Sequence, residues 1–302
     1  MLRKRTTPNL LAACAMATVV ATACTDATNP LAVAPSAPLA AKNKVVFTHP
    51  AGVLSQTLPQ LAGAWGIALS STGDVLTAFP SGNSIGGTSL SDPTTFRQVL
   101  PVDGWPLDII VNAKGTLAYV SSGSTGNIDV IDVQSNTKAD TIPLAPNIDR
   151  LRLSKKESVI YATTLDGKLW AVALKGGKKV KAPIDLTDPW NIAVSPDGST
   201  LWAAAENGAV LKLDPMTLAV IATIPIGYGY GGPFALAISP DGARVYAAAS
   251  QSGAIYIISE PTPNTFDVSS IFVGGDPRRI AFSADGSTAV VSNYYTGVHI
   301  IQ

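Results

Sequence analysis

The sequence predicts an all-β protein, a six-bladed β-propeller of four-stranded antiparallel blades whose last blade is closed by an N-terminal strand. Three observations support this fold class. Apolar and polar residues alternate in short runs, turns rich in Gly, Pro and Asp separate the runs, and the whole pattern recurs about every 42 residues. One four-stranded sheet cannot bury both of its faces, so the copies are expected to pack on one another.

Residues 191–226 are the most regular copy of the repeat. Residues 191–194 alternate with period two, as a half-buried strand does. The turn Ser-Pro-Asp-Gly at 195–198 follows, since Pro fixes φ, Asp bonds to nearby backbone and Gly accepts positive φ. Further strands are expected over 201–205, 209–213 and 219–226.

The first turn of each copy gives the number of blades. Five turns end on glycine, and the spacings between them are 42, 83, 44 and 44 residues; these glycines are Gly73, Gly115, Gly198, Gly242 and Gly286. The long gap contains one more copy whose turn carries Glu157, 42 residues after Gly115 and 41 before Gly198. Six copies with four strands each have the spacing of propeller blades.

The sixth copy ends after its third strand, at residues 297–301. Residues 53–59 match the register of 139–143, a fourth strand in another copy. We therefore expect the N-terminal strand to complete the last blade and to cover its open edge. The propeller domain spans residues 44–302.

Several copies carry motifs of a known repeat. Tyr119-Val120-Ser121-Ser122, Val130-Ile131-Asp132 and the Ser-Pro-Asp-Gly turns resemble the YVTN-type β-propeller repeat, found in lactonase-like propellers among others. The resemblance covers residues 45–302. It implies the propeller fold but no single activity, because functions vary within such families.

The first residues have a different character. Arg3, Lys4 and Arg5 precede an apolar run over 10–23, and Cys24 follows a small-residue cleavage pattern. This resembles a bacterial lipoprotein signal peptide (1–23), with Cys24 as the lipidated residue and 24–43 as a flexible tether. The alternatives are an ordinary signal peptide cut nearby or an uncleaved anchor. The expected location is the cell envelope, periplasmic or surface-exposed, with the membrane as one partner.

Composition narrows the possible partners and chemistry. After removal of the signal peptide the chain has 18 basic and 21 acidic residues, and no cysteine other than Cys24. A disulfide framework and a thiolate metal site are excluded. We do not expect the protein to bind nucleic acid. We expect it to be a monomer. Residues 146–187 hold nine of the basic residues and have a net charge of +5. This basic sector is either a docking surface or a solvated hairpin tip.

Residues suited to catalysis are scarce. His49 and His299 are the only histidines, and no HExxH, CxxCH or G-x-S-x-G motif occurs. The aspartates of the Ser-Pro-Asp-Gly turns are explained by turn chemistry rather than by calcium. We therefore assign no catalytic residue, metal ligand or cofactor.

The positions that enter the innermost strands differ most between copies. In a propeller these residues surround the mouth of the central channel, whereas the deeper positions are uniformly apolar. Aromatic, arginine and carboxylate side chains occupy this mouth ring: Trp65, Asp108, Asp149, Arg150, Trp190, Asn191, Phe234, Arg278 and Arg279. Aromatic rings offer stacking faces and arginines bind anions. Alternatively, the charges neutralise one another and the aromatic rings fill the channel.

The sequence thus favours a binding propeller that takes a protein, peptide or glycan through its mouth face. The second hypothesis is an enzyme that resembles lactonase-like or lyase-like propellers with a metal in the channel. Its only candidate ligands are Asp108, Asp149 and Asn191.

Overall fold

The computed structural model describes residues 65–70, 74–89, 92–175, 183–186, 189–205, 208–226, 233–283, 285–293, 295 and 297–301. All of them belong to the compact unit Val45–Gln302. The predicted signal peptide, Cys24, the tether and the closing strand 53–59 lie outside the described residues. Within the described ranges, no helix is long and apolar enough to cross a membrane.

The described residues form six antiparallel sheets, one for each predicted copy. Blade one contains β1 (Ile67–Leu69), β2 (Asp74–Phe79), β3 (Ser84–Ser89) and β4 (Asp92–Pro101), with the 3-10 turn η2 (Pro80–Gly82) between β2 and β3. Blade two contains β5 (Pro106–Val111), β6 (Leu117–Ser122), β7 (Asn127–Asp132) and β8 (Thr137–Pro143). Blade three contains β9 (Ile148–Leu153), β10 (Val159–Thr164), β11 (Lys168–Ala173) and β12 (Ile184–Asp185).

The second half repeats the plan. Blade four contains β13 (Asn191–Val194), β14 (Leu201–Ala205), β15 (Ala209–Leu213) and β16 (Val220–Pro225). Blade five contains β17 (Pro233–Ile238), β18 (Arg244–Ala249), β19 (Ala254–Thr262) and β20 (Thr265–Phe272). Blade six contains β21 (Pro277–Phe282), β22 (Ala289–Asn293) and β23 (Gly297–Ile301).

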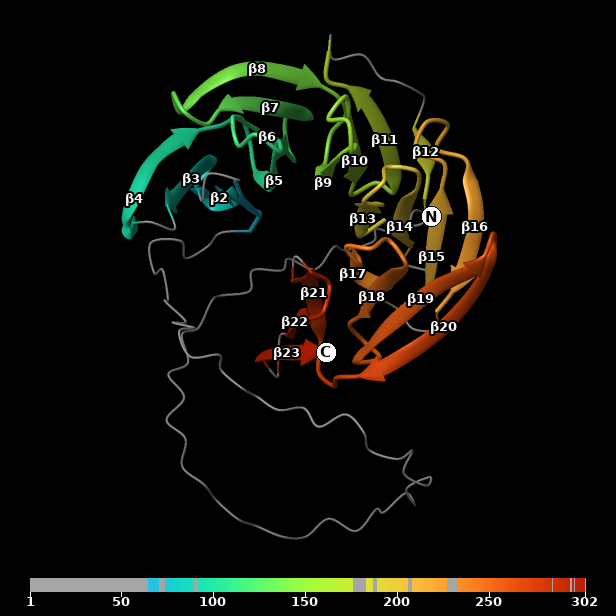
Figure 1. Ribbon diagram of the computed structural model, residues 1–302. Coiled ribbons are helices and arrows are strands. Elements are labelled where there is room, and N and C mark those ends of the chain that lie inside the picture. The colour runs from blue at the N-terminus through green and yellow to red at the C-terminus, as the bar shows by residue number, and fades with distance from the viewer. Residues whose placement is uncertain are drawn as a thin grey trace, which may run out of the picture. The chain divides into compact units, whose positions relative to one another are not determined.

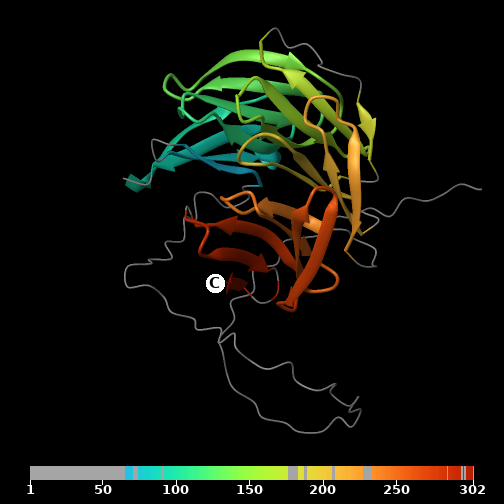
Figure 2. The same ribbon diagram turned by 45° about the vertical axis from the view of Figure 1, so that its right-hand side comes forward.

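The sheets follow one another around a common centre (Figures 1 and 2). The first strand of each blade lies innermost, and β5, β9, β13, β17 and β21 face the middle of the ring in Figure 1. Neighbouring innermost strands contact each other in chain order from β1 to β21. The predicted six-bladed propeller of antiparallel strands is confirmed.

The turn of blade three confirms the predicted repeat copy in which Glu157 replaces the turn glycine. Glu157 has a φ of +51°, in the same left-handed region as Gly115 at +73° and Gly198 at +77°. Its carboxylate accepts a hydrogen bond from the backbone N–H of Ala113, in the equivalent turn of blade two. A non-glycine residue therefore adopts the left-handed conformation that this turn requires, and a hydrogen bond to the preceding blade stabilises it there.

The Ser-Pro-Asp-Gly turn of blade four shows why its aspartate is there. Ser195 Oγ donates to Asp197 Oδ1 over 2.6 Å, and the Ser199 N–H donates to the same oxygen over 3.0 Å. These hydrogen bonds stabilise the carboxylate and lower the pKa of Asp197 to about 2. Asp241 and Asp285 make the equivalent bonds in blades five and six.

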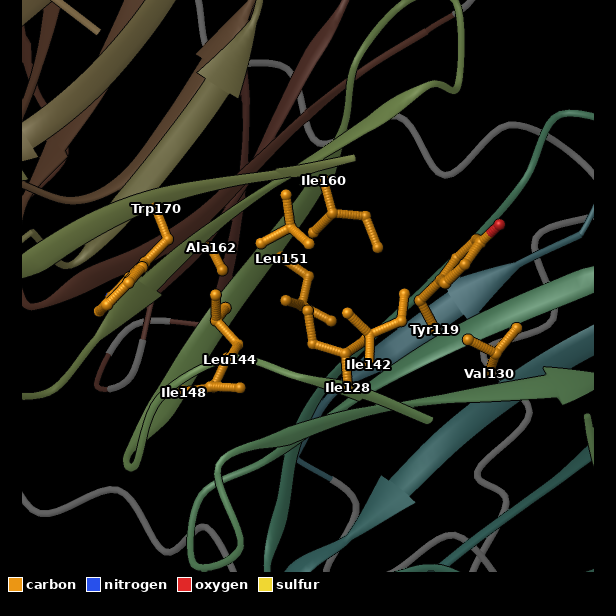
Figure 3. Close-up of a cluster of buried hydrophobic side chains, with 11 residues drawn as sticks. Tyr119, Ile128, Val130, Ile142, Leu144, Ile148, Leu151, Ile160, Ala162 and Trp170 are labelled. Atoms are coloured by element: carbon orange, nitrogen blue, oxygen red, sulfur yellow. The ribbon is translucent and has the colours of Figure 1, made fainter. Parts of the chain in front are cut away.

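The hydrophobic core lies between the blades. Five clusters of buried side chains each join two consecutive blades, from blades one and two to blades five and six. Figure 3 shows the cluster between blades two and three, where Ile128 and Ile142 face Leu151 and Ile160. All four side chains are almost fully buried. Stability therefore comes from blade-to-blade packing, as expected for a chain without a disulfide framework.

Blades one and six do not repeat this pattern. Ile67 and Leu69 on β1 are 66% and 61% exposed, whereas the equivalent Ile109 on β5 is 1% exposed. The described part of blade six has three strands, with β23 at its edge. The segment predicted to cover that edge, residues 53–59, lies outside the described residues, so the closing strand stays a prediction.

Candidate functional site

The mouth ring is carried by the innermost strands. Asp108 lies on β5, Asp149 and Arg150 on β9, Asn191 on β13, Phe234 on β17, and Arg278 and Arg279 on β21. Trp190 immediately precedes β13, and Trp65 lies two residues before β1. Because these strands contact one another in order, one ring of positions becomes one surface around the channel. Within that surface the side chains form three groups.

The first group is held together by Arg152, which the sequence prediction omitted from the ring. Its Nη1 donates to Asp108 Oδ2 on blade two, and its Nη2 donates to Asn191 Oδ1 on blade four, each over 3.3 Å. Asp108 Oδ2 also accepts the backbone N–H of Leu151 over 3.0 Å. Asp108 and Asn191 are 7% and 2% exposed. Two polar side chains are therefore fixed by one guanidinium across three blades.

Asp149 and Arg150 lie beside this group. Arg150 Nε lies 3.6 Å from Asp149 Oδ2, and that Nε is buried without a hydrogen-bond partner. Burial raises the pKa of Asp149, and the positive charge of Arg150 opposes part of the rise. Within the described ranges the Asp149 carboxylate accepts no hydrogen bond, so its oxygens have capacity for a ligand or water.

The second group is a stack of aromatic and guanidinium planes. The rings of Trp190 and Phe234 lie 4.8 Å apart, and the Arg278 guanidinium lies 4.4 Å from the centre of the Phe234 ring. Arg278 also donates to Asp276 Oδ2 through Nε and Nη2, over 2.9 and 2.6 Å. This stack joins blades four, five and six and fixes Arg278 in place.

Arg279 differs from the other arginines at the mouth. Its side chain is exposed, and the one hydrogen bond that it makes among the described residues goes from Nη1 to the Arg278 carbonyl over 3.4 Å. The protein around the channel removes part of its hydration and Arg150 repels it, which together lower the pKa of Arg279 to about 10. Arg279 is still charged at neutral pH. No described carboxylate lies within ion-pair distance of it.

The third group is Trp65 with Trp105. Their rings meet edge to face at 6.3 Å, and they are 55% and 43% exposed. Within the described part of the chain, Trp65 makes no ring contact with Trp190 or Phe234. The structure thus brings together eight of the nine predicted ring residues through blades two to six, and places Trp65 in a separate aromatic pair.

A small cleft opens between blades three and four. It has a volume of about 140 Å³ and is lined by Asp149, Thr164, Leu165, Pro189 and Trp190. The Trp190 Nε1–H is buried and has no hydrogen-bond partner. Two residues of the mouth ring, Asp149 and Trp190, therefore line one cleft beside the channel.

The arrangement does not suit a metal at Asp108, Asp149 and Asn191. The Asp108 and Asn191 oxygens that would bind a cation already accept hydrogen bonds from Arg152. A second cation between them would be repelled by this guanidinium. Elsewhere in the described ranges, no cluster of three or more His, Cys, Asp or Glu side chains is placed to hold a metal.

The described residues of the basic sector include two arginines at the mouth and a lysine at a turn. Arg150 and Arg152 face the mouth, where each has an aspartate partner. Lys168 pairs with Asp166 over 2.8 Å at a hairpin turn. Lys178, Lys179 and Lys181 lie outside the described residues. Among these described side chains, two lie at the mouth and one lies at a turn.

The sequence does contain a signal for Arg152. Arg152 stands five residues before the turn position of its copy, where the other copies have small or apolar residues: Ala68, Ile110, Ala193, Ala237 and Ala281. A single charge at a position that is otherwise apolar marks a departure from the repeat. Asp276, the partner of Arg278, does not stand out from the repeat in the same way.

Many solved structures resemble this propeller. A chain of hydrazine synthase from Kuenenia stuttgartiensis aligns with 86% of this chain and 99% of its own length, at 16% identity and a TM-score of 0.55. A chain from a crystal structure of the mitotic checkpoint complex aligns with 79% of this chain and 78% of its own, at 14% identity and a TM-score of 0.67. No family model and no curated protein sequence matches the chain. The similarity supports the propeller fold alone, and the YVTN resemblance stays a prediction.

Proposed function

We propose that this protein is a non-enzymatic binding propeller, anchored in the cell envelope through Cys24, that takes an anionic protein, peptide or glycan at its mouth. The observation that carries the proposal is Arg279. It is the exposed, charged side chain of the ring that makes no ion pair with a described carboxylate.

The other arginines of the mouth explain why Arg279 is the anion site. Arg150, Arg152 and Arg278 each have an aspartate within 3.6 Å, so an anion would have to compete with an existing pair. An anion at Arg279 breaks no ion pair and restores the charge balance that the guanidinium lacks. Arginine presents a planar fork that suits carboxylate and phosphate groups.

The neighbouring aromatic side chains add contact area. Trp190 and Phe234 are half-buried and stacked, so their positions are fixed before a ligand arrives. Binding then orders few side chains, which keeps its entropic cost low. The enzyme hypothesis lacks this support, because two of its three candidate metal ligands, Asp108 and Asn191, accept hydrogen bonds from Arg152.

The proposal is tested with Arg279→Gln in the purified full-length protein. Two anionic probes, hexaglutamate peptide and trigalacturonate, are titrated by calorimetry at low salt. We expect at least one probe to bind, and Arg279→Gln to weaken that binding by about tenfold or more, because a charge-assisted hydrogen bond is lost. The melting temperature should not change.

Arg244→Gln is the matched control, because Arg244 is exposed and lies at the start of β18, outside the ring. It should bind the probe as the wild type does. Equal weakening by both substitutions would indicate a general charge effect and would refute the assignment to Arg279. Failure of both probes to bind would refute the anion site.

A further inference from the structure

Trp65 and Trp105 form an exposed aromatic corner at the mouth end of blades one and two. Their rings meet edge to face, with 6.3 Å between the ring centres and 86° between the ring planes. Both side chains are accessible, since Trp65 is 55% exposed and Trp105 is 43% exposed. Side chains that only stabilise a fold are buried more completely, so two accessible indoles side by side mark a candidate contact surface.

The backbone holds Trp105 in a conformation that few bulky residues adopt. Its φ is +47°, in the left-handed region, and Gly104 before it has the same φ. The Trp105 N–H donates to Asn83 Oδ1 over 2.7 Å, and the Trp105 carbonyl accepts the Gly123 N–H over 3.0 Å. Such conformations persist where the surroundings fix them, and they cluster at ligand-binding sites. The Trp105 backbone is therefore fixed before any ligand arrives.

The two rings are positioned as well. A Cβ added to Gly123 would lie 3.2 Å from Trp105 Cε3, so the indole packs over a glycine that leaves room for it. Trp65 is tied to β2, because its backbone N–H donates to the Ala78 carbonyl over 2.9 Å. Two indoles that are held at a right angle form a preorganised surface, which lowers the entropic cost of binding.

Exposed aromatic side chains gather at this end of the blades. Each first strand begins at the mouth, each fourth strand ends there, and the turn between the second and third strands lies there too. The exposed aromatic side chains of the described residues all occupy such positions: Trp65, Trp105, Phe272 and Tyr295. Exposed aromatic residues combined with arginine are typical of protein and peptide interfaces. The mouth end has this composition.

The polar groups beside the aromatic corner favour a peptide over a glycan. Asn83 Oδ1 already accepts the Trp105 N–H, and Ser122 Oγ already donates to the Gly104 carbonyl over 2.5 Å. The hydroxyls of a sugar stacked on the indoles would compete with these bonds. An aromatic side chain needs no hydrogen bond and can contact both indoles in edge-to-face or offset geometry.

We propose that the aromatic corner is a subsite for an aromatic side chain, and that the mouth ligand is an acidic peptide. An aromatic residue of this peptide packs against Trp65 and Trp105, and a carboxylate of the same peptide binds Arg279. This inference rests on the proposed function, since it names the ligand class of the same mouth.

A pair of synthetic peptides tests the subsite in the full-length protein. Each peptide joins hexaglutamate through a flexible glycine linker to a short tail, which is diphenylalanine in one and dialanine in the other. Both are titrated by calorimetry at low salt. We expect the phenylalanine peptide to bind about tenfold more tightly than the alanine peptide, because its rings bury apolar surface against the indoles.

Trp105→Asn should abolish this preference for phenylalanine. The substitution removes the indole, while asparagine accepts the left-handed φ, so the melting temperature should not change. Met216→Asn is the matched control, because Met216 is an exposed apolar side chain in the turn between β15 and β16, at the end of the blade opposite the mouth. This variant should keep the tenfold preference.

The outcomes separate this inference from the proposed function. If the wild type binds both peptides equally, the aromatic corner is not a subsite, while the mouth function stands as long as Arg279→Gln weakens hexaglutamate binding. A preference that survives Trp105→Asn would overturn the assignment to this corner. An equal loss of preference in Met216→Asn would do the same, because the effect would not be local.

Two further results distinguish the ligand classes. If trigalacturonate binds and neither peptide does, the ligand is an acidic glycan, so the peptide inference is refuted while the anion site stands. If Arg279→Gln leaves hexaglutamate binding unchanged and Trp105→Asn still abolishes the preference, the anion site is refuted and the aromatic subsite stands.

Discussion

Arg152 connects more of the mouth than any single predicted residue. It belongs to blade three, and it donates hydrogen bonds to Asp108 on blade two and to Asn191 on blade four. Both partners are buried and would lack these bonds without it. The side chain is thus a structural link of the ring as well as a source of positive charge beside the cleft.

Replacing Arg152 should therefore destabilise the propeller. Arg152→Gln leaves the Asp108 carboxylate buried without its counter-charge, and we expect a loss of about 2–3 kcal/mol of unfolding free energy. Arg152→Lys keeps the charge but cannot reach both partners with a fork, so its loss should be about half as large. Urea denaturation measures both values.

A double substitution shows whether the ion pair is the cause. With Asp108→Asn already present, Arg152→Gln should cost much less, because no buried carboxylate remains to be compensated. Arg244→Gln, on an exposed side chain, should change stability by no more than about 0.5 kcal/mol. If Arg152→Gln lowers the unfolding free energy by the same amount with and without Asp108→Asn, the bridge contributes nothing to stability.

At the level of the strands, Gly66, immediately before β1, lies against the backbone of β5. A Cβ added to Gly66 would lie 2.8 Å from the Asp108 Cα and 3.0 Å from the backbone N of Ile109. Both neighbours are main-chain atoms of the next blade and cannot rotate away. Gly66 stands at the mouth-ring position that carries Asp108 in blade two, so its lack of a side chain is required by packing.

We predict that Gly66→Ala separates β1 from β5 and destabilises the protein by about 1–3 kcal/mol, the usual cost of overpacking. Gly82→Ala is the matched control, since its Cβ would meet only the Ser84 hydroxyl at 3.1 Å, which can move. Thermal unfolding followed by circular dichroism compares the two. Similar melting temperatures for both variants would contradict the close approach.

The positions of the strands could be predicted from the sequence because their signals are local. Period-two alternation and turn residues are properties of a few neighbouring positions, and even Glu157 was found from spacing alone. Partners between blades were not predictable in the same way. Asp108, Arg152 and Asn191 are about 40 residues apart in the chain, and nothing in the repeat says which side chain is long enough to bridge sheets. The separation of Trp65 from Trp190 is a second example, because both occupy the same repeat position.

At the level of the whole molecule, the ring has to be closed between blades six and one. Each of the five described junctions is sealed by a buried apolar cluster. A sixth junction would join blade one, where Ile67 and Leu69 are exposed, to blade six, whose described part has three strands. An exposed apolar face and an open strand edge are both costly in water. The predicted closing strand, residues 53–59, would pair with β23 and bring the two blades together.

Deleting residues 53–59 should therefore lower the melting temperature by several degrees, since each kcal/mol lost corresponds to about 2–4 °C in a domain of this size. It should also promote association, because the edge of β23 remains free to pair with another chain. Deleting residues 25–31 removes the same length from the predicted tether and should leave the melting temperature unchanged. Scanning calorimetry measures the transitions, and light scattering measures association. If both deletions melt like the full-length protein and stay monomeric, another segment closes the ring and the sequence-based assignment of the clasp is wrong.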